Sequence, residues 1–219
     1  MMAASAMCRC IGEKAGVPAR RELNKPMPRE SRNPLLETKR LQLRQWCAAD
    51  TRPFAAMNAD PVVMKFFPTV LSAEESNSHV QRLSTAIAER GWGLWAIELK
   101  ETREFIGFTG LNIPFFSALP FYPCTEIGWR LGTKYWGRGY ATEAAEVALQ
   151  FAFENLALPE VVAFTPVANL RSAAVMQRLG MRDTGQNFLH PAIPSGHQLQ
   201  EHLLYKITRS TWIQGRECC

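Results

Sequence analysis

The sequence predicts an α/β fold built on a mixed β-sheet, and three observations carry this prediction. Residues 126–131 alternate as a strand does, and a glycine-containing break then leads into a helical pattern from about Gly139. The strand-like runs 92–99 and 104–111 are separated by a charged turn, which is typical of an antiparallel hairpin. A buried strand at 161–165 follows a helix-length crossover, so it should lie parallel to the strand at 126–131.

A strand and two helices are expected before the hairpin. Residues 38–46 alternate apolar and polar side chains as a strand does, and a helix should follow through about Asn58. Ser72-Ala-Glu-Glu75 has the form of a capping box, in which both side chains satisfy free backbone donors. A helix should therefore begin there and end near Gly91.

The C-terminal part supplies two more helices and a final strand. Apolar residues recur at helical spacing from Tyr140 to Ala152. A second helical pattern covers 169–179 with Gly180 as its stop, and 202–208 reads as the last strand.

Residues 112–123, between the hairpin and the strand at 126–131, form an insertion rich in aromatic side chains. An aromatic loop at this place either shapes a substrate pocket or covers the sheet, and the sequence leaves both open. The four aromatic residues are Phe115, Phe116, Phe121 and Tyr122.

The length and the charge of the chain limit its number of domains and the classes of partner it could bind. A chain of 219 residues that is 47% hydrophobic can bury one substantial core, which we place at residues 35–213. A disordered basic extension at 1–34 and a short tail at 214–219 would flank it. The extension carries seven Lys/Arg and three Glu, or +4, so the remaining 185 residues hold +1 of the net +5. A nearly neutral domain argues against nucleic acid as a partner, and no apolar run reaches the roughly 18 residues of a membrane span.

Cysteine and histidine positions argue against disulfides and bound metal. The six cysteines are scattered, so we expect free thiols in a reducing cytosol and a cytoplasmic protein. The spacing of His190, His197 and His202 matches no zinc site, so we expect structural roles for them and no metal. The cysteines are Cys8, Cys10, Cys47, Cys124, Cys218 and Cys219.

The glycines around Arg138 mark the stretch that carries the most chemistry. Gly137 and Gly139 let the backbone approach a ligand closely, and the first amides of the helix that follows have no partner within it. Such amides bind phosphate, and the helix dipole favours an anion at the same place. The spacing fits neither a P-loop nor a Rossmann fingerprint, which argues against a nicotinamide cofactor.

This stretch resembles the acetyl-CoA loop of the GNAT N-acetyltransferases. Residues 136–141, Trp-Gly-Arg-Gly-Tyr-Ala, are similar to the family pattern Gln/Arg-x-x-Gly-x-Gly/Ala, although Trp136 replaces the usual Gln or Arg. The longer run 135–144 resembles the RimJ/RimL-like branch, which includes ribosomal-protein N-terminal acetyltransferases. Asn169, Ser172 and Gly180 fit a second family motif, and the resemblance covers about residues 36–212.

The resemblance implies a GNAT fold that uses acetyl-CoA as co-substrate. It implies a mixed sheet of about six to seven strands, with helices on both faces and a splayed parallel strand pair that holds CoA. The pyrophosphate would bind the amides of residues 138–142, and the pantetheine arm would pair with the strand from Ile127 to Leu131. The cofactor-binding residues so implied are Ile127, Trp129, Leu131, Trp136, Gly137, Arg138, Gly139, Tyr140, Ala141, Thr142, Asn169, Ser172 and Met176.

The same resemblance implies two catalytic residues. Glu126 leads the strand that pairs with the cofactor, where the family often places a catalytic glutamate that deprotonates the amine. Its alternative is a solvent-facing strand acid. The family's usual acid is a tyrosine, but that position is Met176 here. Resemblance to the RimJ/RimL-like branch implies instead a serine three residues after the asparagine, which is Ser172. Ser172 could instead be a helix cap or a backbone donor.

We therefore expect an N-acetyltransferase that moves acetyl from acetyl-CoA to a primary amine by direct attack in a ternary complex. The branch resemblance favours a peptide or protein N-terminus as the acceptor. A polyamine or antibiotic amine is the alternative within enzymes, and an idle acyl-CoA-binding or ribosome-docking module is the alternative outside them. The sequence leaves a homodimer open.

Overall fold

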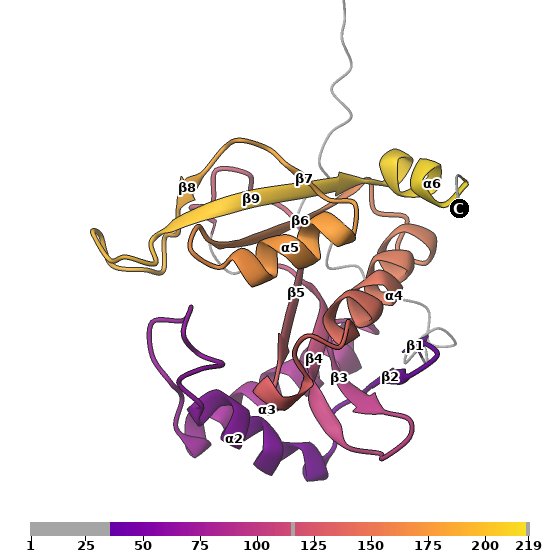
Figure 1. Cartoon of the computed structure of the whole chain (residues 1–219), viewed down its shortest axis with the longest axis vertical. Coiled ribbons are helices and arrows are strands. Elements are labelled where there is room, and N and C mark those ends of the chain that lie inside the picture. Colours follow the sequence, from indigo (N-terminus) through magenta and orange to yellow (C-terminus); the bar gives the residue numbers. More distant parts are fainter. Residues whose placement is uncertain (1–35, 115–116, 218–219) are drawn as a thin grey trace, which may run out of the picture.

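The computed structural model describes residues 36–114 and 117–217 (Figure 1). The expected extension at 1–34 and the insertion residues Phe115 and Phe116 lie outside the described residues. So do four of the six cysteines, namely Cys8, Cys10, Cys218 and Cys219.

One mixed sheet organises the described chain. Its strand order is β1-β2-β3-β4-β5-β6-β9-β7, with β8 beside β9, and every pairing is antiparallel except that of β5 with β6. The strands are β1 (Leu36–Glu37), β2 (Leu41–Arg44), β3 (Leu94–Leu99), β4 (Phe105–Asn112), β5 (Glu126–Leu131), β6 (Glu160–Pro166), β7 (Arg182–Asp183), β8 (Phe188–Leu189) and β9 (Glu201–Thr208).

The mixed sheet is confirmed, but the expected count of about six to seven strands was low, since the described residues form nine. The six longer strands are those that the sequence predicted. The three extra ones, β1, β7 and β8, have two residues each, which is too short for alternation to show in the sequence.

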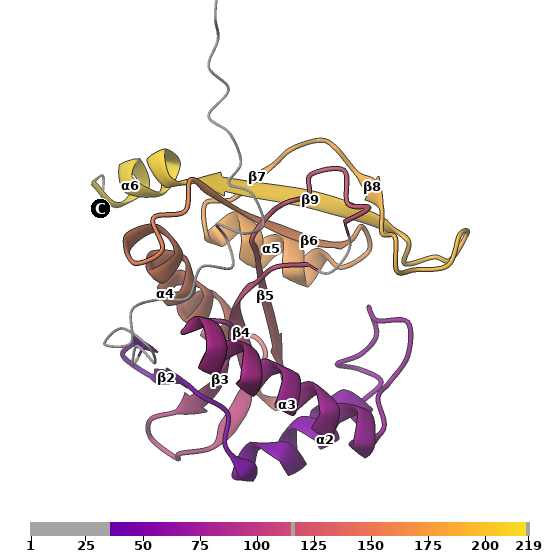
Figure 2. The ribbon, with the colours of Figure 1, turned by 180° about the vertical axis from the view of Figure 1, so that it is seen from behind.

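Helices cover both faces of the sheet. Figures 1 and 2 show α4 on one face and α2 with α3 on the opposite face. The helices are η2 (Ala48–Asp50), α2 (Thr51–Ala59), α3 (Ala73–Arg90), η3 (Thr133–Tyr135), α4 (Tyr140–Glu154), α5 (Leu170–Arg178) and α6 (Arg209–Glu217). The sequence did not predict α6, which continues past the expected domain end at residue 213.

The predicted capping box fixes the start of α3. The Ser72 hydroxyl accepts a hydrogen bond from the Glu75 amide at 3.1 Å, and the Ser72 amide donates to the Glu75 carboxylate at 2.7 Å. Gly91 ends the helix in the left-handed region at φ 83°, which a side chain would disfavour.

Strand register assigns the residues of β4 and β5 to the two faces. Phe108, on the α2/α3 face, packs on Phe54 of α2 with ring centroids 5.9 Å apart. Trp95 of β3, on the α4 face, packs on Phe151 of α4 at 5.3 Å. Because side chains alternate along a strand, the α2/α3 face carries Asn112 opposite Glu126, Gly110 opposite Gly128 and Phe108 opposite Arg130.

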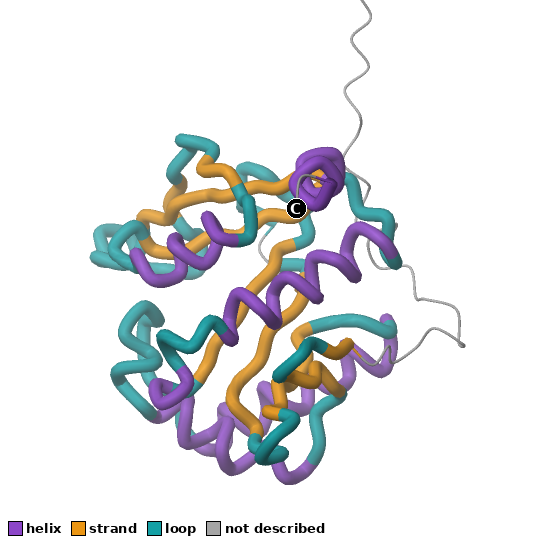
Figure 3. Tube along the Cα trace, turned by 45° about the vertical axis from the view of Figure 1, so that its right-hand side comes forward, coloured by secondary structure: helices purple, strands orange, loops and turns teal. Residues whose placement is uncertain are grey.

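The parallel pair β5 and β6 diverges after one contact. Glu126 pairs with Val162, and no further pair follows in the described residues, whereas β6 pairs with β9 along its whole length. Figure 3 shows the two parts of the sheet separating beyond this point. The sheet therefore contains the splayed parallel pair that the resemblance implied.

Candidate active site

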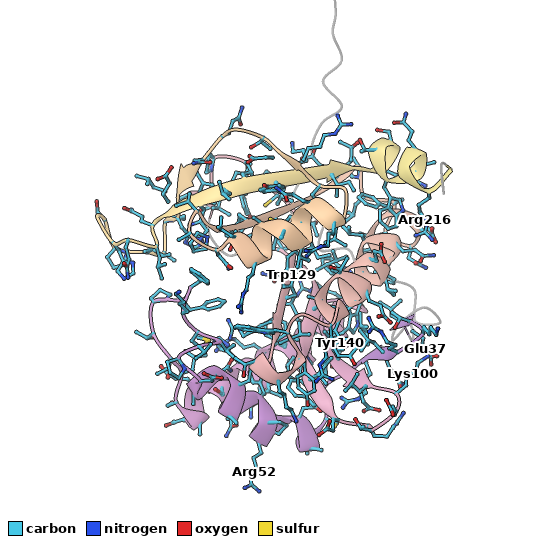
Figure 4. The ribbon with its side chains drawn as sticks, viewed as in Figure 1. Glu37, Arg52, Lys100, Trp129, Tyr140 and Arg216 are labelled. Carbon is cyan, nitrogen blue, oxygen red and sulfur yellow. The ribbon has the colours of Figure 1, made fainter. Side chains whose placement is uncertain are left out.

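The exposed edge of β5 lies inside this splay. One edge of the strand pairs with β4 at six positions, while the other meets β6 only at Glu126. Backbone groups beyond Glu126 on the β6 side have no strand partner in the described chain, so they can pair with an extended ligand. Ile127 and Leu131 are buried on the α4 face, and Trp129 between them is partly exposed (Figure 4).

The loop before α4 is built to approach an anion. Gly137 and Gly139 have φ values of 72° and 78°, a region that residues with a Cβ rarely adopt. A Cβ on Gly137 would meet nothing within 4 Å, so the loop backbone is open to a ligand. Gly139 caps α4, whose first amides, at residues 140–142, lack partners within the helix. These amides and the helix dipole fit a pyrophosphate.

Trp136 ties this loop to the end of β5. Its indole nitrogen donates a hydrogen bond to the Leu131 carbonyl at 2.8 Å. The Arg171 guanidinium, from the first turn of α5, lies 4.8 Å from the centre of the Trp136 ring. Trp136 thus has a structural role in this loop. Arg171 is a cation beside the loop that the sequence did not single out.

A polar cluster holds the N-terminus of α4 against the strands at residues 36–44. The Arg40 side chain donates to the Glu143 carboxylate at 2.7 Å and lies 4.5 Å over the ring of Tyr140, which Figure 4 labels at the start of α4. The Thr38 hydroxyl donates to the same carboxylate. Burial opposes ionisation of Glu143, but the hydrogen bonds from Thr38 and Arg40 lower its pKa below the ordinary value. The Glu143 carboxylate is therefore held by hydrogen bonds from Thr38 and Arg40, and it is not free to act as a base.

Glu126 has the properties of a base that works near neutral pH. It is partly buried, and its Oε1 accepts a hydrogen bond from the Asn112 amide at 2.8 Å. Burial raises the pKa of Glu126 to about 7, although the bond from Asn112 acts in the opposite direction. A carboxylate with this pKa can take a proton at pH 7 to 8, which a solvent-facing acid does far less well.

The second motif places Asn169 and Ser172 at the start of α5. The Asn169 side chain accepts from the Ser172 amide at 3.3 Å and donates to the Thr165 hydroxyl at 2.9 Å, so it caps the helix. The Ser172 hydroxyl is partly buried and has no hydrogen-bond partner among the described residues. Met176 is only 1% exposed and belongs to the core, so the structure gives it little surface for a cofactor.

Phe121 of the insertion and two of the histidines belong to one aromatic cluster on β6, β8 and β9. Phe121 packs on Phe188 and Phe164 at 4.9 and 5.9 Å, which makes it part of a cover over β6 and β8. His190 and His202 lie 4.9 Å apart in the same cluster, and burial lowers the pKa of His202 to about 4. In the described ranges no group of three or more His, Cys, Asp or Glu side chains could hold a metal.

Arg130 is a further residue that the sequence reading missed. It lies on the α2/α3 face of β5, on the same side as Glu126, and its Nη1 donates to the Asn58 side chain of α2 at 2.6 Å. The guanidinium lies 4.0 Å over the ring of Phe67. The only signal in the sequence was a charged residue inside a largely apolar strand.

A comparison with protein families matches a model described as an acetyltransferase (GNAT) domain to residues 40–182, well over half of the chain. The chain belongs to the GNAT acetyltransferase family. As a GNAT protein it is an acetyl-CoA-dependent acyltransferase, which agrees with the splay and the open loop. No helix in the part of the chain that the structure describes is long and apolar enough to cross a membrane.

Similar proteins support the same assignment. The chain is 29% identical to an uncharacterized N-acetyltransferase, YnaD of Bacillus subtilis, over 81% of this chain and 98% of that one. It is 31% identical to FsC-acetyl coenzyme A-N(2)-transacetylase of Aspergillus fumigatus over 83% and 79%. A crystal structure of a GNAT acetyltransferase from Bacillus anthracis, 25% identical, superposes with a TM-score of 0.68 over 81% of this chain and 99% of that one.

Proposed function

We propose that this GNAT protein acetylates a primary amine by direct attack on acetyl-CoA in a ternary complex, with Glu126 as the general base. The single observation that carries the proposal is Glu126 itself, a partly buried carboxylate with a pKa near 7 at the point where β5 and β6 part. An α-amine has a pKa of about 8, so proton transfer to Glu126 is nearly balanced. A lysine amine, at about 10.4, would be harder to deprotonate.

The chain's residues would divide the work as follows. The amides of residues 138–142 bind the pyrophosphate, and the free edge of β5 from Ile127 to Leu131 pairs with the pantetheine arm. Glu126 takes the proton of the ammonium group, directly or through a water, and the amine nitrogen then bonds to the thioester carbon. The C–S bond breaks as the carbonyl re-forms, and the nitrogen loses its second proton, which passes through water to the departing thiolate. Ser172 donates a hydrogen bond to that thiolate. A thiol pKa near 8.5 makes this leaving group a good one.

The cysteines near the site support direct attack over an acetyl-cysteine intermediate. Cys124, two residues before Glu126, is buried, and burial together with the charge of Glu126 raises the pKa of its thiol to about 12. It therefore stays protonated and is a poor nucleophile. Because Cys47 and Cys124 are both free thiols, we also place the protein in the reducing cytoplasm.

A peptide or protein N-terminus is the acceptor we favour, since the 135–144 motif resembles the RimJ/RimL-like branch and the pKa of Glu126 suits an α-amine. A small-molecule amine is the second candidate. It is supported by the Aspergillus relative, whose name specifies a transfer to N(2) of FsC.

Thiol release from acetyl-CoA over a panel of amines tests both acceptors. The panel contains short peptides with free N-termini, the same peptides with blocked N-termini, a polyamine and an aminoglycoside. We expect turnover with the free peptides and background rates with the blocked ones. Faster turnover of a small amine would select the second candidate, and no turnover with any amine would refute the enzymatic proposal.

A further inference from the structure

Arg130 lies at one end of an open strip of sheet that begins at Glu126. Both side chains are on the α2/α3 face of β5, with only Gly128 between them on that face. A Cβ on Gly128 would meet nothing within 4 Å, and the residue opposite on β4 is Gly110, which also has no side chain. The surface of β5 between the base and the arginine is therefore open at Gly128, while Gly110 beside it is buried.

The charge of Arg130 has no counterion among the described residues. Its polar contact is the bond from Nη1 to Asn58, and its Nε is enclosed without a hydrogen-bond partner. Burial, with no opposing acid, lowers the pKa of Arg130 to about 10. Arg44 shows the contrast within the same chain, since Asp50 and Glu98 both lie 2.7 Å from its guanidinium.

Besides Asn58, two aromatic rings and a histidine lie near Arg130. Phe67 and Phe108 lie 4.0 and 5.4 Å from the guanidinium carbon. The pKa of His79 on α3 is lowered, first by burial and then by the charge of Arg82. The charge of Arg130 lowers it further, which places His79 near the guanidinium. A partly buried cation without an acidic partner is costly, so a carboxylate that binds here gains a charge-assisted hydrogen bond.

We propose that Arg130 binds a carboxylate of the acetyl acceptor, so that the preferred acceptor is an amine that also carries an acidic group. The inference rests on the proposed function. The amine binds near Glu126, the acceptor crosses the strip over Gly128, and its acid meets the free Nη2 and Nε edge of Arg130. Because Nε is enclosed, a carboxylate reaches it only if a neighbouring side chain such as Phe67, which is 39% exposed, moves.

Strand geometry limits the acceptor. Glu126 and Arg130 are four residues apart along the strand, so their Cα atoms are separated by roughly 13 Å. The acid must then lie several bonds from the reacting amine, as an Asp or Glu side chain does near the start of a peptide. Polyamines and aminoglycosides would place like charges beside Arg130, which disfavours them.

Matched acceptors test the inference. Short peptides carry Glu at position 2, 3 or 4, and each is compared with the peptide that has Gln at the same position. We expect kcat/KM to favour the Glu peptide by roughly ten- to hundredfold at one or more positions, the range of a hydrogen bond to a charged group. Equal rates within every Glu/Gln pair would overturn the proposal. Absence of turnover with any peptide would instead count against the proposed function.

Two variants assign the preference to Arg130. Arg130→Met should abolish the Glu preference while it retains turnover of the Gln peptides. Arg52→Met is the matched control, because Arg52 on α2 points into solvent (Figure 4), and it should retain the preference. A structural role alone would lower the rates of both peptides equally. If Arg130→Met does not fold, Arg130→Lys, which keeps the charge but loses the planar fork, should show a reduced preference.

Discussion

Glu126 and Arg130 show what a strand pattern can and cannot predict about single residues. The position of Glu126 at the start of β5, together with the family resemblance, made it a candidate base, and this role stays a prediction. The structure places Glu126 partly buried beside Asn112. Arg130 was overlooked because the alternating pattern of a strand predicts on which face of the sheet a side chain lies. The pattern does not predict which residues from distant parts of the chain contact that side chain. The partners that enclose it come from α2 and from Phe67, more than 60 positions earlier in the chain.

The kinetic role of Glu126 is tested by Glu126→Gln. A general base contributes on the order of 10²- to 10⁴-fold, so kcat should fall by that factor while acetyl-CoA affinity stays nearly unchanged. In the unmodified protein kcat should rise through about pH 7 as the carboxyl loses its proton. The defect of the variant should shrink as pH approaches the amine's own pKa, whereas a defect in Ser172→Ala should not. Wild-type turnover by Glu126→Gln from pH 6 to 9 would rule out the base.

The same variant should change stability with a definite sign. The folded-state pKa of Glu126, about 7, lies above the ordinary 4.5, so the folded protein holds this proton more tightly than the unfolded chain. The tightly held proton adds to the free energy of unfolding. This contribution is fully present below about pH 4.5 and is lost as pH rises through about 7. Thermal unfolding of Glu126→Gln should therefore give a higher midpoint than the parent at pH 8 and little difference at pH 4.5. A lower midpoint for Glu126→Gln than for the parent at pH 8 would mean that Glu126 is not desolvated in the folded protein.

At the scale of elements, local sequence rules were sufficient for the helix starts and for the long strands. The capping box at Ser72 and the break before α4 appear as predicted, because each is set by residues within one turn. The two-residue strands and α6 were not predicted, since β7 and β8 are strands only through their pairing with β9. The splay could be expected only from the family resemblance, because no local pattern shows where two strands stop pairing.

The glycine loop gives a sharp comparison of two substitutions. Gly137→Val should weaken acetyl-CoA binding at least tenfold, because the side chain would enter the space that the ligand needs. Gly185→Val is the matched control, since Gly185 also has a positive φ, 66°, and open space around its Cβ. Both variants should lose about 1–2 kcal/mol of stability from backbone strain. Isothermal titration that finds equal affinities in the two variants would show that the loop is only a turn.

At the scale of the whole molecule, the sequence predicts that the core forms without the first 34 residues, because that segment lacks the apolar content to join a core. The buried apolar residues run from Leu41 to Trp212, and the first described strand begins at Leu36. Removing residues 1–34 should therefore leave the thermal midpoint and the turnover of a short peptide unchanged. A lower midpoint in the shortened chain would show that the extension packs on the domain. Loss of activity toward a large acidic acceptor alone would make the basic extension a recruiting arm.

The central claim is that one folded unit brings acetyl-CoA and an amine together and transfers the acetyl group between them directly. Initial rates measured over a grid of acetyl-CoA and peptide concentrations test it, together with the mass of the protein after incubation with acetyl-CoA alone. Direct attack in a ternary complex predicts intersecting double-reciprocal lines and an unchanged protein mass. Parallel lines, with the mass of one acetyl group added to the protein before any amine is present, would contradict the account.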